Sequence, residues 1–126
     1  YEGSFVNSRK EADQISSSFY SSYEKLLNKI DNMNNIYINK GWIPDIFKYQ
    51  EDRKYSFVHI DVDLYEPTKE AHIYFFERLQ KGGIIVCDDY NSQGFNGAKK
   101  AWDEFFGKVN VKINYAPAVS GSFAVK

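Results

Sequence analysis

The sequence predicts an α/β fold built on a strand, helix, strand unit. Residues 57–60 and 84–87 are short apolar segments rich in β-branched residues, a pattern typical of strands buried on both faces of a sheet. Between them, Pro67 stands where the first helical turn is expected, apolar residues recur at helical spacing, and Gly82 and Gly83 end the pattern. Because a helix crosses between the two strands, we expect them to be parallel.

Both predicted strands end in aspartates. Asp61 and Asp63 follow the first strand, and Asp88 and Asp89 follow the second. In a parallel pair, all four carboxylates emerge at the edge where open α/β sheets bind ligands. Carboxylates crowded there repel one another unless a cation or a shared proton offsets the charge, and their oxygens suit Mg²⁺, Ca²⁺ or Mn²⁺. The alternative is that they only cap the next helix or bind loop amides, but four together favour a metal or catalytic site.

Length and composition limit the classes of protein. The chain of 126 residues is long enough for one domain, and its net charge of -1 gives no electrostatic case for nucleic acid or an acidic membrane surface. The single cysteine, Cys87, lies in an apolar segment, so no disulfide can form within the chain and a reducing compartment is expected. No apolar run reaches the length of a membrane span, and no signal peptide is recognisable at Tyr1. We therefore expect a cytoplasmic protein, and a first residue other than Met suggests a longer gene product.

The remaining segments predict the other elements of the sheet and its helices. A capping-box pattern opens a helix over residues 9–32 whose apolar side should cover one face of the sheet. A short strand is expected at 36–39 and a helix at 98–107. Residues 109–115 and 122–126 should pair as antiparallel strands, because only turn residues separate them.

The sequence also suggests positions or roles for Trp42 and the two histidines. Trp42, beside Gly41, could stack on a flat ligand group or pack against the sheet. His59 lies within the first predicted strand, so we expect a hydrogen-bonded core residue rather than a metal ligand. His72 lies on the crossover helix and is expected at the surface.

Two motifs at this spacing resemble the macrocin O-methyltransferase (TylF-like) family. They are FVHIDVDLYEPT at 57–68 and GGIIVCDDY at 82–90. The segments KGWIPD at 40–45 and GAKKA at 97–101 resemble further landmarks of the same family, as does the opening Tyr1-Glu2-Gly3. The landmarks occur in family order over nearly the whole chain, and the paired motifs are fairly specific, whereas either alone would be weak.

The resemblance implies a class I S-adenosylmethionine-dependent methyltransferase. Its sheet would be Rossmann-like and mostly parallel, with an antiparallel C-terminal hairpin. Its acceptor would be a hydroxyl of a small molecule, often a sugar or another natural product, and Mg²⁺ would assist. Carried over by position, Asp61, Asp88 and Asp89 would be the metal ligands, and Asp61 would also be the catalytic base.

The same resemblance implies where the cofactor would lie. Gly41 and Trp42 would lie near its adenine, and Asp63 nearer its amino acid end. The family's glycine-rich turn and ribose-binding acid would precede Tyr1, so residues 1–126 are expected to be a single domain, the C-terminal portion of a methyltransferase that lacks the first two strands. Such a portion should bind cofactor weakly, and its exposed strand edges should favour a homo-oligomer.

Two other functions fit parts of the pattern. Asp61 and Asp63 after an apolar strand also fit the nucleophile motif of a haloacid dehalogenase-type phosphohydrolase, although that fold places the motif near the start of the chain. A non-catalytic binding or assembly module that has lost its cofactor half is the other alternative. Release of phosphate from an aryl phosphate would identify the phosphohydrolase.

Overall fold

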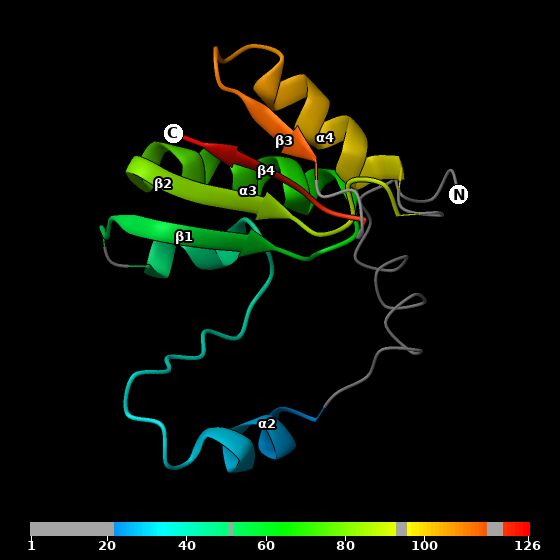
Figure 1. Ribbon diagram of the computed structural model, residues 1–126. Coiled ribbons are helices and arrows are strands. Elements are labelled where there is room, and N and C mark those ends of the chain that lie inside the picture. Colours follow the sequence, from blue (N-terminus) through cyan, green and yellow to red (C-terminus); the bar gives the residue numbers. More distant parts are fainter. Residues whose placement is uncertain (1–21, 51, 93–95, 116–119) are drawn as a thin grey trace.

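The computed structural model describes residues 22–50, 52–92, 96–115 and 120–126 (Figure 1). Its helices are α2 (Tyr23–Ile30), α3 (Tyr65–Arg78) and α4 (Asn96–Phe106), with a 3-10 helix η2 (Asp45–Tyr49). Its strands are β1 (Tyr55–Ile60), β2 (Leu79–Cys87), β3 (Ile113–Tyr115) and β4 (Ser122–Val125). None of the helices within these residues is long and apolar enough to cross a membrane.

The four strands form one mixed sheet in the order β1-β2-β4-β3. β1 and β2 are parallel, with Phe57 opposite Ile84 and Ile60 opposite Cys87, which confirms the predicted crossover. β4 is antiparallel to both β2 and β3, which confirms the predicted C-terminal hairpin. The expectation of a mostly parallel sheet is wrong for the described residues, because only the β1/β2 pair is parallel.

Helices α3 and α4 cover one face of the sheet and form the core with it (Figure 1). Trp102 of α4 is fully buried, as are Ile85 of β2 and Ala124 of β4. Phe106 of α4 contacts Trp102 of the same helix at a centroid distance of 4.3 Å and meets Phe76 of α3 edge to face at 5.4 Å. Burial of this apolar surface holds the two acid-bearing strand ends in place.

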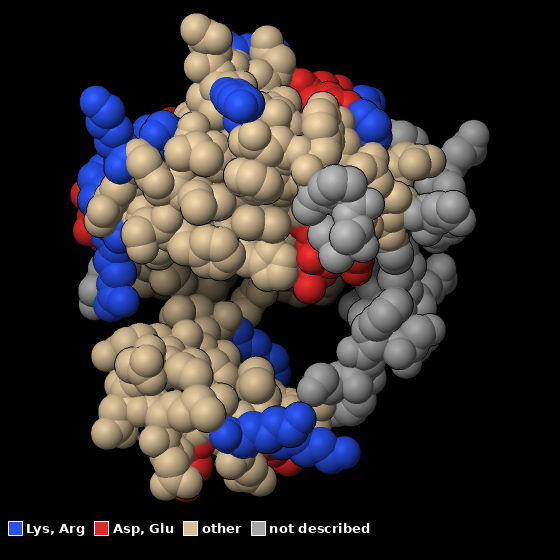
Figure 2. Space-filling view, in the orientation of Figure 1, with Lys and Arg blue, Asp and Glu red and all other residues tan. Residues whose placement is uncertain are grey.

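The opposite face of the sheet is open in the described part of the chain. Phe57 is 59% exposed, and Ile84 and Val125 on the neighbouring strands are exposed as well. Figure 2 shows this side as a broad surface with few charged side chains. The expectation that β1 and β2 are buried on both faces is therefore wrong, since α3 and α4 lie on one side only and residues of each strand alternate between the two sides.

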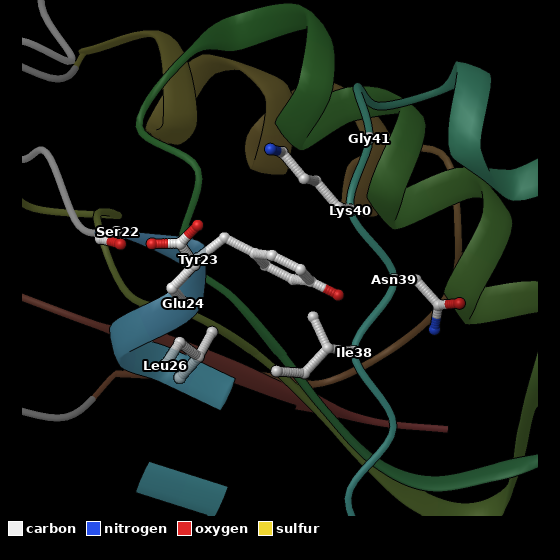
Figure 3. Close-up of a pocket in the computed structure, with 8 residues that line it drawn as sticks. All are labelled: Ser22, Tyr23, Glu24, Leu26, Ile38, Asn39, Lys40 and Gly41. Carbon is white, nitrogen blue, oxygen red and sulfur yellow. The ribbon is translucent and has the colours of Figure 1, made fainter. Parts of the chain in front are cut away.

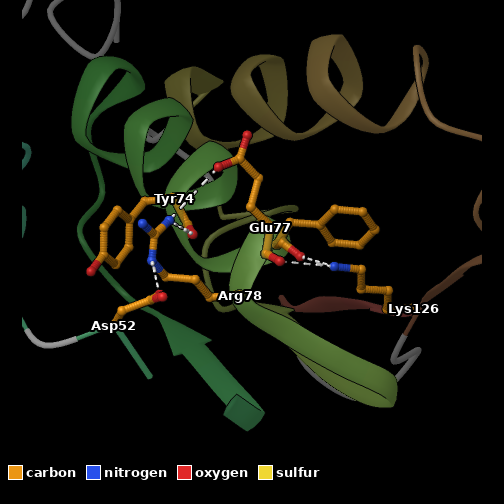
Figure 4. Close-up of polar contacts among 6 residues, drawn as sticks. Asp52, Tyr74, Glu77, Arg78 and Lys126 are labelled. Atoms are coloured by element: carbon orange, nitrogen blue, oxygen red, sulfur yellow. Dashed lines mark hydrogen bonds and ion pairs between the residues drawn. The ribbon is translucent and has the colours of Figure 1, made fainter. Parts of the chain in front are cut away.

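Helix α3 ends earlier than expected, and β2 follows it at once. The helix stops at Arg78 rather than at the glycines, and Gly82, with φ of 79°, lies within β2. Lys126 donates hydrogen bonds from Nζ to the carbonyl oxygens of Phe76 at 2.7 Å and Glu77 at 3.1 Å (Figure 4). Carbonyls at a helix end lack partners within the helix, so this lysine caps α3 from the end of the sheet.

The segment before β1 differs most from expectation. Of the helix predicted at 9–32, only α2 lies within the described residues, and residues 9–21 lie outside them. α2 buries no residue and lies apart from the sheet, so the described part of the predicted helix does not cover the sheet (Figure 1). Residues 36–39 form no strand, because no described strand pairs with them.

Candidate functional site

The predicted acid edge is present at the carboxyl ends of β1 and β2. Asp61 directly follows β1, and Asp88 and Asp89 directly follow β2. The Asp88 N–H donates a hydrogen bond to the Ile60 carbonyl oxygen at 3.0 Å, so the two strand ends stay joined where the acids begin. Parallel pairing therefore brings the two acid motifs to one place, as the sequence predicts.

Asp63 occupies a tight turn between β1 and α3. Its φ is 60°, and the Leu64 N–H donates to the Val62 carbonyl at 2.6 Å across it, which makes a γ-turn. Left-handed backbone is uncommon for residues other than glycine, although Asp and Asn tolerate it better than most. The turn places the Asp63 carboxylate beside those of the strand ends.

Three of the four carboxylates form a compact group. Oxygen atoms of Asp61, Asp63 and Asp89 all lie within 4.8 Å of one another. Asp61 is exposed and Asp63 is half-buried, while Asp89 is only 8% exposed. An open side lined by hard oxygen ligands fits a divalent cation such as Mg²⁺, which binds through one or two carboxylates and keeps several waters.

Burial and mutual repulsion raise the pKa values of two carboxyl groups in this cluster. Burial is the largest cause that raises the pKa of Asp89, to about 7, and the charges of Asp63 and Asp61 and a hydrogen bond with Asp63 add to it. Burial also raises the pKa of Asp63, with smaller contributions from the charges of Asp61 and Asp88. Carboxylates this close cannot all ionise without cost, so a shared proton or a cation must offset the charge.

Asp88 lies outside the three-carboxylate group. Its Oδ1 is 3.2 Å from Nε2 of His59, and both side chains are about half exposed. His59 is an exposed residue of β1, so the expectation that it belongs to the core is wrong. The reason is that the open face of the sheet, on which His59 lies, has no covering helix in the described residues.

The position of the other histidine, His72, also differs from the expectation. His72 is fully buried between α3 and α4, with its ring 5.1 Å from Trp102 and 5.7 Å from Phe106, so the expectation of a surface residue is wrong. Neither ring nitrogen has a hydrogen-bond partner among the described residues, and burial lowers the pKa of His72 to about 3. Cys87 is also buried, which raises the pKa of its thiol to about 12 and disfavours the reactive thiolate.

Sequence reasoning missed two tyrosines that link the acid motifs to α4. Tyr65 follows the first motif, and its hydroxyl donates to Oε2 of Glu104 at 2.5 Å. Tyr90 follows the second motif, and its hydroxyl donates to Oδ1 of Asp103 at 2.9 Å. The available signal was a tyrosine at the end of each acid motif together with adjacent Lys and acid pairs four residues apart on α4.

Gly41 and Trp42 lie before η2, away from the acid motifs in sequence. Gly41 lines a cavity of about 670 Å³ between α2 and residues 38–41, into which the Tyr23 ring extends (Figure 3). A Cβ at Gly41 would meet Cδ1 of Ile46 at 2.8 Å, so a larger residue there would displace the Ile46 side chain. Trp42 is 43% exposed. None of the four aspartates is among the described residues that line this cavity, so Gly41 and Asp63 do not share it.

Solved structures with similar folds include several O-methyltransferases. The O-methyltransferase NovP matches with a TM-score of 0.68 at 20% identity over 90% of this chain and 48% of that one. CalS11, a TDP-rhamnose 3'-O-methyltransferase of calicheamicin biosynthesis, matches with a TM-score of 0.55 at 21% identity over 66% of this chain and 36% of that one. An O-methyltransferase from Bacillus cereus, solved with SAH, matches with a TM-score of 0.59 at 14% identity over 97% and 61%. The chain thus spans between 36% and 61% of the length of these proteins.

At these identities the structures establish the fold alone, and no match was found among curated protein sequences. The family comparison is more specific. The model of macrocin O-methyltransferase (TylF) matches residues 11–116, which include both acid motifs and most of the chain. This assignment replaces the phosphohydrolase alternative. The chain belongs to the macrocin O-methyltransferase (TylF) family.

Proposed function

We propose that the chain is part of an S-adenosylmethionine-dependent O-methyltransferase that acts on a hydroxyl of a sugar or another natural product, assisted by Mg²⁺. The group formed by Asp61, Asp63 and Asp89 carries the proposal, because three carboxylates within 4.8 Å at the ends of parallel strands call for a cation. Family membership supports methyl transfer, and the TDP-rhamnose enzyme among the similar structures supports a sugar acceptor.

Each carboxylate has a defined part in this proposal. A bound divalent cation lowers the pKa of a hydroxyl and fixes its orientation. Asp89, the most buried of the three, would anchor the cation from the sheet side, and Asp63 is held next to it by the γ-turn. Asp61 is exposed, so it can reach an acceptor hydroxyl and take its proton.

The identity of the third ligand separates two versions of the site. The family resemblance implies Asp61, Asp88 and Asp89, whereas the geometry supports Asp61, Asp63 and Asp89 because Asp88 is hydrogen-bonded to His59. We favour Asp61, Asp63 and Asp89 as the ligands of the cation. In that version Asp63 would hold the cation and not the amino acid end of the cofactor.

Calorimetric titration with Mn²⁺ tests the site and separates the versions. We expect binding by the 126-residue chain, and loss of at least about tenfold in affinity in both Asp89→Asn and Asp63→Asn, since a lost charged ligand costs more than 1.4 kcal/mol. Asp88→Asn is the matched control and should bind nearly as the wild type does. A loss confined to Asp88→Asn and Asp89→Asn would support the resemblance-based set, and equal affinity in all variants would refute the site.

Cofactor binding is proposed at Gly41 and Trp42 through the adenine. Gly41 lines the cavity of about 670 Å³, and Trp42, the next residue in the sequence, is 43% exposed. Stacking of a flat base on an aromatic ring is sequence-tolerant and worth about 1–3 kcal/mol. A Trp42→Ala variant should therefore weaken binding of S-adenosylhomocysteine by about tenfold or more, and Tyr49→Ala, at another exposed aromatic residue, is the control.

Activity is best tested on this chain and on a longer gene product together, because the chain spans only 48% of NovP. We expect little methyl transfer by residues 1–126 alone and transfer to a sugar hydroxyl by the longer protein, followed as release of S-adenosylhomocysteine. Asp61→Asn should abolish that release, because it removes the proposed base and a cation ligand. Full activity of Asp61→Asn would show that the base has been misassigned.

Self-association is proposed through β1. Among the described residues β1 is an edge strand, and Phe57 on it is 59% exposed. Unpaired strand edges with apolar side chains recruit other chains, whereas charged residues block such pairing. We expect light scattering to detect a dimer that Phe57→Lys converts to a monomer, and a monomeric wild type at high concentration would refute the proposal.

A further inference from the structure

Helix α4 presents two matched pairs of a lysine and an acid to the two acid motifs. Lys99 pairs with Asp103, and Lys100 pairs with Glu104 at 3.8 Å, each four residues apart. The two pairs are offset by one residue, so they project in neighbouring directions from the helix. Each lysine–acid pair contacts one tyrosine, Tyr65 or Tyr90, and the two tyrosines belong to different acid motifs.

The first contact holds the loop after β1. Tyr65 lies two residues beyond Asp63, at the start of α3, and its hydroxyl donates a hydrogen bond to Glu104 at 2.5 Å. The Lys100 ammonium lies 5.0 Å from the Tyr65 ring centroid, so both Lys100 and its partner Glu104 interact with Tyr65. The position of the Asp63 turn is thus tied to α4 by a side chain close to it in sequence.

The second contact holds the loop after β2. Tyr90 directly follows Asp89 and is 5% exposed, and its hydroxyl donates a hydrogen bond to Asp103 at 2.9 Å. Lys99 donates to the Tyr90 hydroxyl oxygen at 3.1 Å and also pairs with Asp103. The ring packs against Trp102 at 6.2 Å, so polar and aromatic contacts fix this side chain together.

The two contacts have one consequence for the site. Asp61 and Asp63 lie on one loop and Asp88 and Asp89 on the other, and the hydrogen bond from the Asp88 N–H to the Ile60 carbonyl joins the loops at their base. We propose that α4 is a clasp that sets the distance between the two acid loops, with Tyr65 and Tyr90 as positioning residues for cation binding. The inference rests on the proposed function, because it assigns these residues to the same cation site.

The clasp makes the cation affinity depend on hydroxyl groups that do not touch the cation. Removing both hydroxyls with Tyr65→Phe/Tyr90→Phe should weaken Mn²⁺ binding by about fivefold or more, as expected when hydrogen bonds that hold ligands in place are lost. Asp103→Asn and Glu104→Gln keep an acceptor oxygen for each tyrosine and should retain affinity, whereas Asp103→Leu and Glu104→Leu should lose it. Tyr74→Phe, at a tyrosine of α3 whose ring stacks on Phe47 at 4.1 Å, is the matched control.

Amide hydrogen exchange without any metal gives a second readout. The Asp88 N–H joins the two loops, so its exchange should be about tenfold faster in Tyr65→Phe/Tyr90→Phe, while exchange of Ile85 at the centre of β2 should stay as in the wild type. Failure of the wild type to bind Mn²⁺ would refute the cation site, and the Asp88 exchange rate would still decide the clasp. Unchanged exchange at Asp88, or an equal effect of Tyr74→Phe, would overturn it.

Discussion

Nε2 of His59 lies 3.2 Å from Oδ1 of Asp88, the one aspartate of the two acid motifs that lies outside the group formed by Asp61, Asp63 and Asp89. Both side chains are about half exposed, at 46% and 51%. Exposed ion pairs contribute roughly 0–1 kcal/mol because water and salt screen them. We therefore expect His59→Ala to change the free energy of unfolding by less than about 1 kcal/mol in urea denaturation.

A larger loss in His59→Ala would show that the contact is structurally important. Asp88→Asn gives the reciprocal measurement, because it removes the charge of Asp88 and leaves the shape of the side chain. The double variant should equal the sum of the singles to within the same small amount.

His72 should make the protein sensitive to acid. Its pKa is about 3 in the folded state and 6.5 ordinarily, so only the unfolded state takes up the proton as the pH falls below about 6.5. The contribution of neutral His72 to the free energy of unfolding is thus intact above that pH and is lost as the pH falls toward 3. Near pH 5 the loss should be about 2 kcal/mol, since one pKa unit corresponds to 1.36 kcal/mol.

His72→Leu removes this proton uptake while filling the apolar site between α3 and α4. We expect the variant to gain stability relative to wild type at about pH 5, and to gain less at about pH 8, where neither state takes up the proton. Thermal unfolding at the two pH values measures the difference. A constant difference between the proteins at both would contradict the burial-driven pKa.

Divalent cations should stabilise the protein more at alkaline than at acid pH. The pKa of Asp89 is raised to about 7, so from about pH 4 to 7 the unfolded state loses its proton first, and the folded state becomes relatively less stable as the pH rises. A cation replaces the shared proton and relieves this cost. We expect the rise in Tm caused by Mg²⁺ to be larger near pH 8 than near pH 5.

The control for this experiment is Asp89→Asn, which cannot ionise. Its response to Mg²⁺ should be small at both pH values, because it lacks the buried ligand. A shift in Tm as large as that of the wild type would place the cation elsewhere on the chain.

Backbone strain at Asp63 predicts an order among its variants. With φ at 60°, the position suits Gly and Asn and costs roughly 1 kcal/mol for residues such as Ala. Asp63→Asn should therefore be more stable than Asp63→Ala by about 0.5–1 kcal/mol, although both lose the carboxylate. Chemical denaturation of the two variants without metal measures this directly, and equal stabilities would argue against a left-handed Asp63.

Lys126 should contribute to stability through the end of α3. Its ammonium donates to the Phe76 and Glu77 carbonyls in the last turn of the helix (Figure 4). Lys126→Met should lower the free energy of unfolding by about 0.5–1.5 kcal/mol, less at high salt because the contact is exposed. Lys81→Met, at an exposed lysine of β2, is the control and should have little effect.

Local sequence patterns were sufficient for the central unit and its acid edge. Apolar runs before Asp61 and Asp88, with a helical pattern between them, predict parallel strands because one crossover helix returns the chain to the starting edge of the sheet. The C-terminal hairpin followed from strand patterns separated by turn residues. The family could be recognised for the same reason, since its motifs are contiguous in the sequence.

Tertiary structure decided which side chains meet. His59 and His72 exchanged their expected places because burial depends on which sheet face the helices cover, and periodicity does not specify this. Asp63 rather than Asp88 joined Asp61 and Asp89 because a γ-turn and a contact with His59 direct the two carboxylates differently. Tyr65 and Tyr90 reach α4 only once the helix packs on the sheet, so contacts between residues 13 and 39 positions apart were settled by packing and not by local sequence.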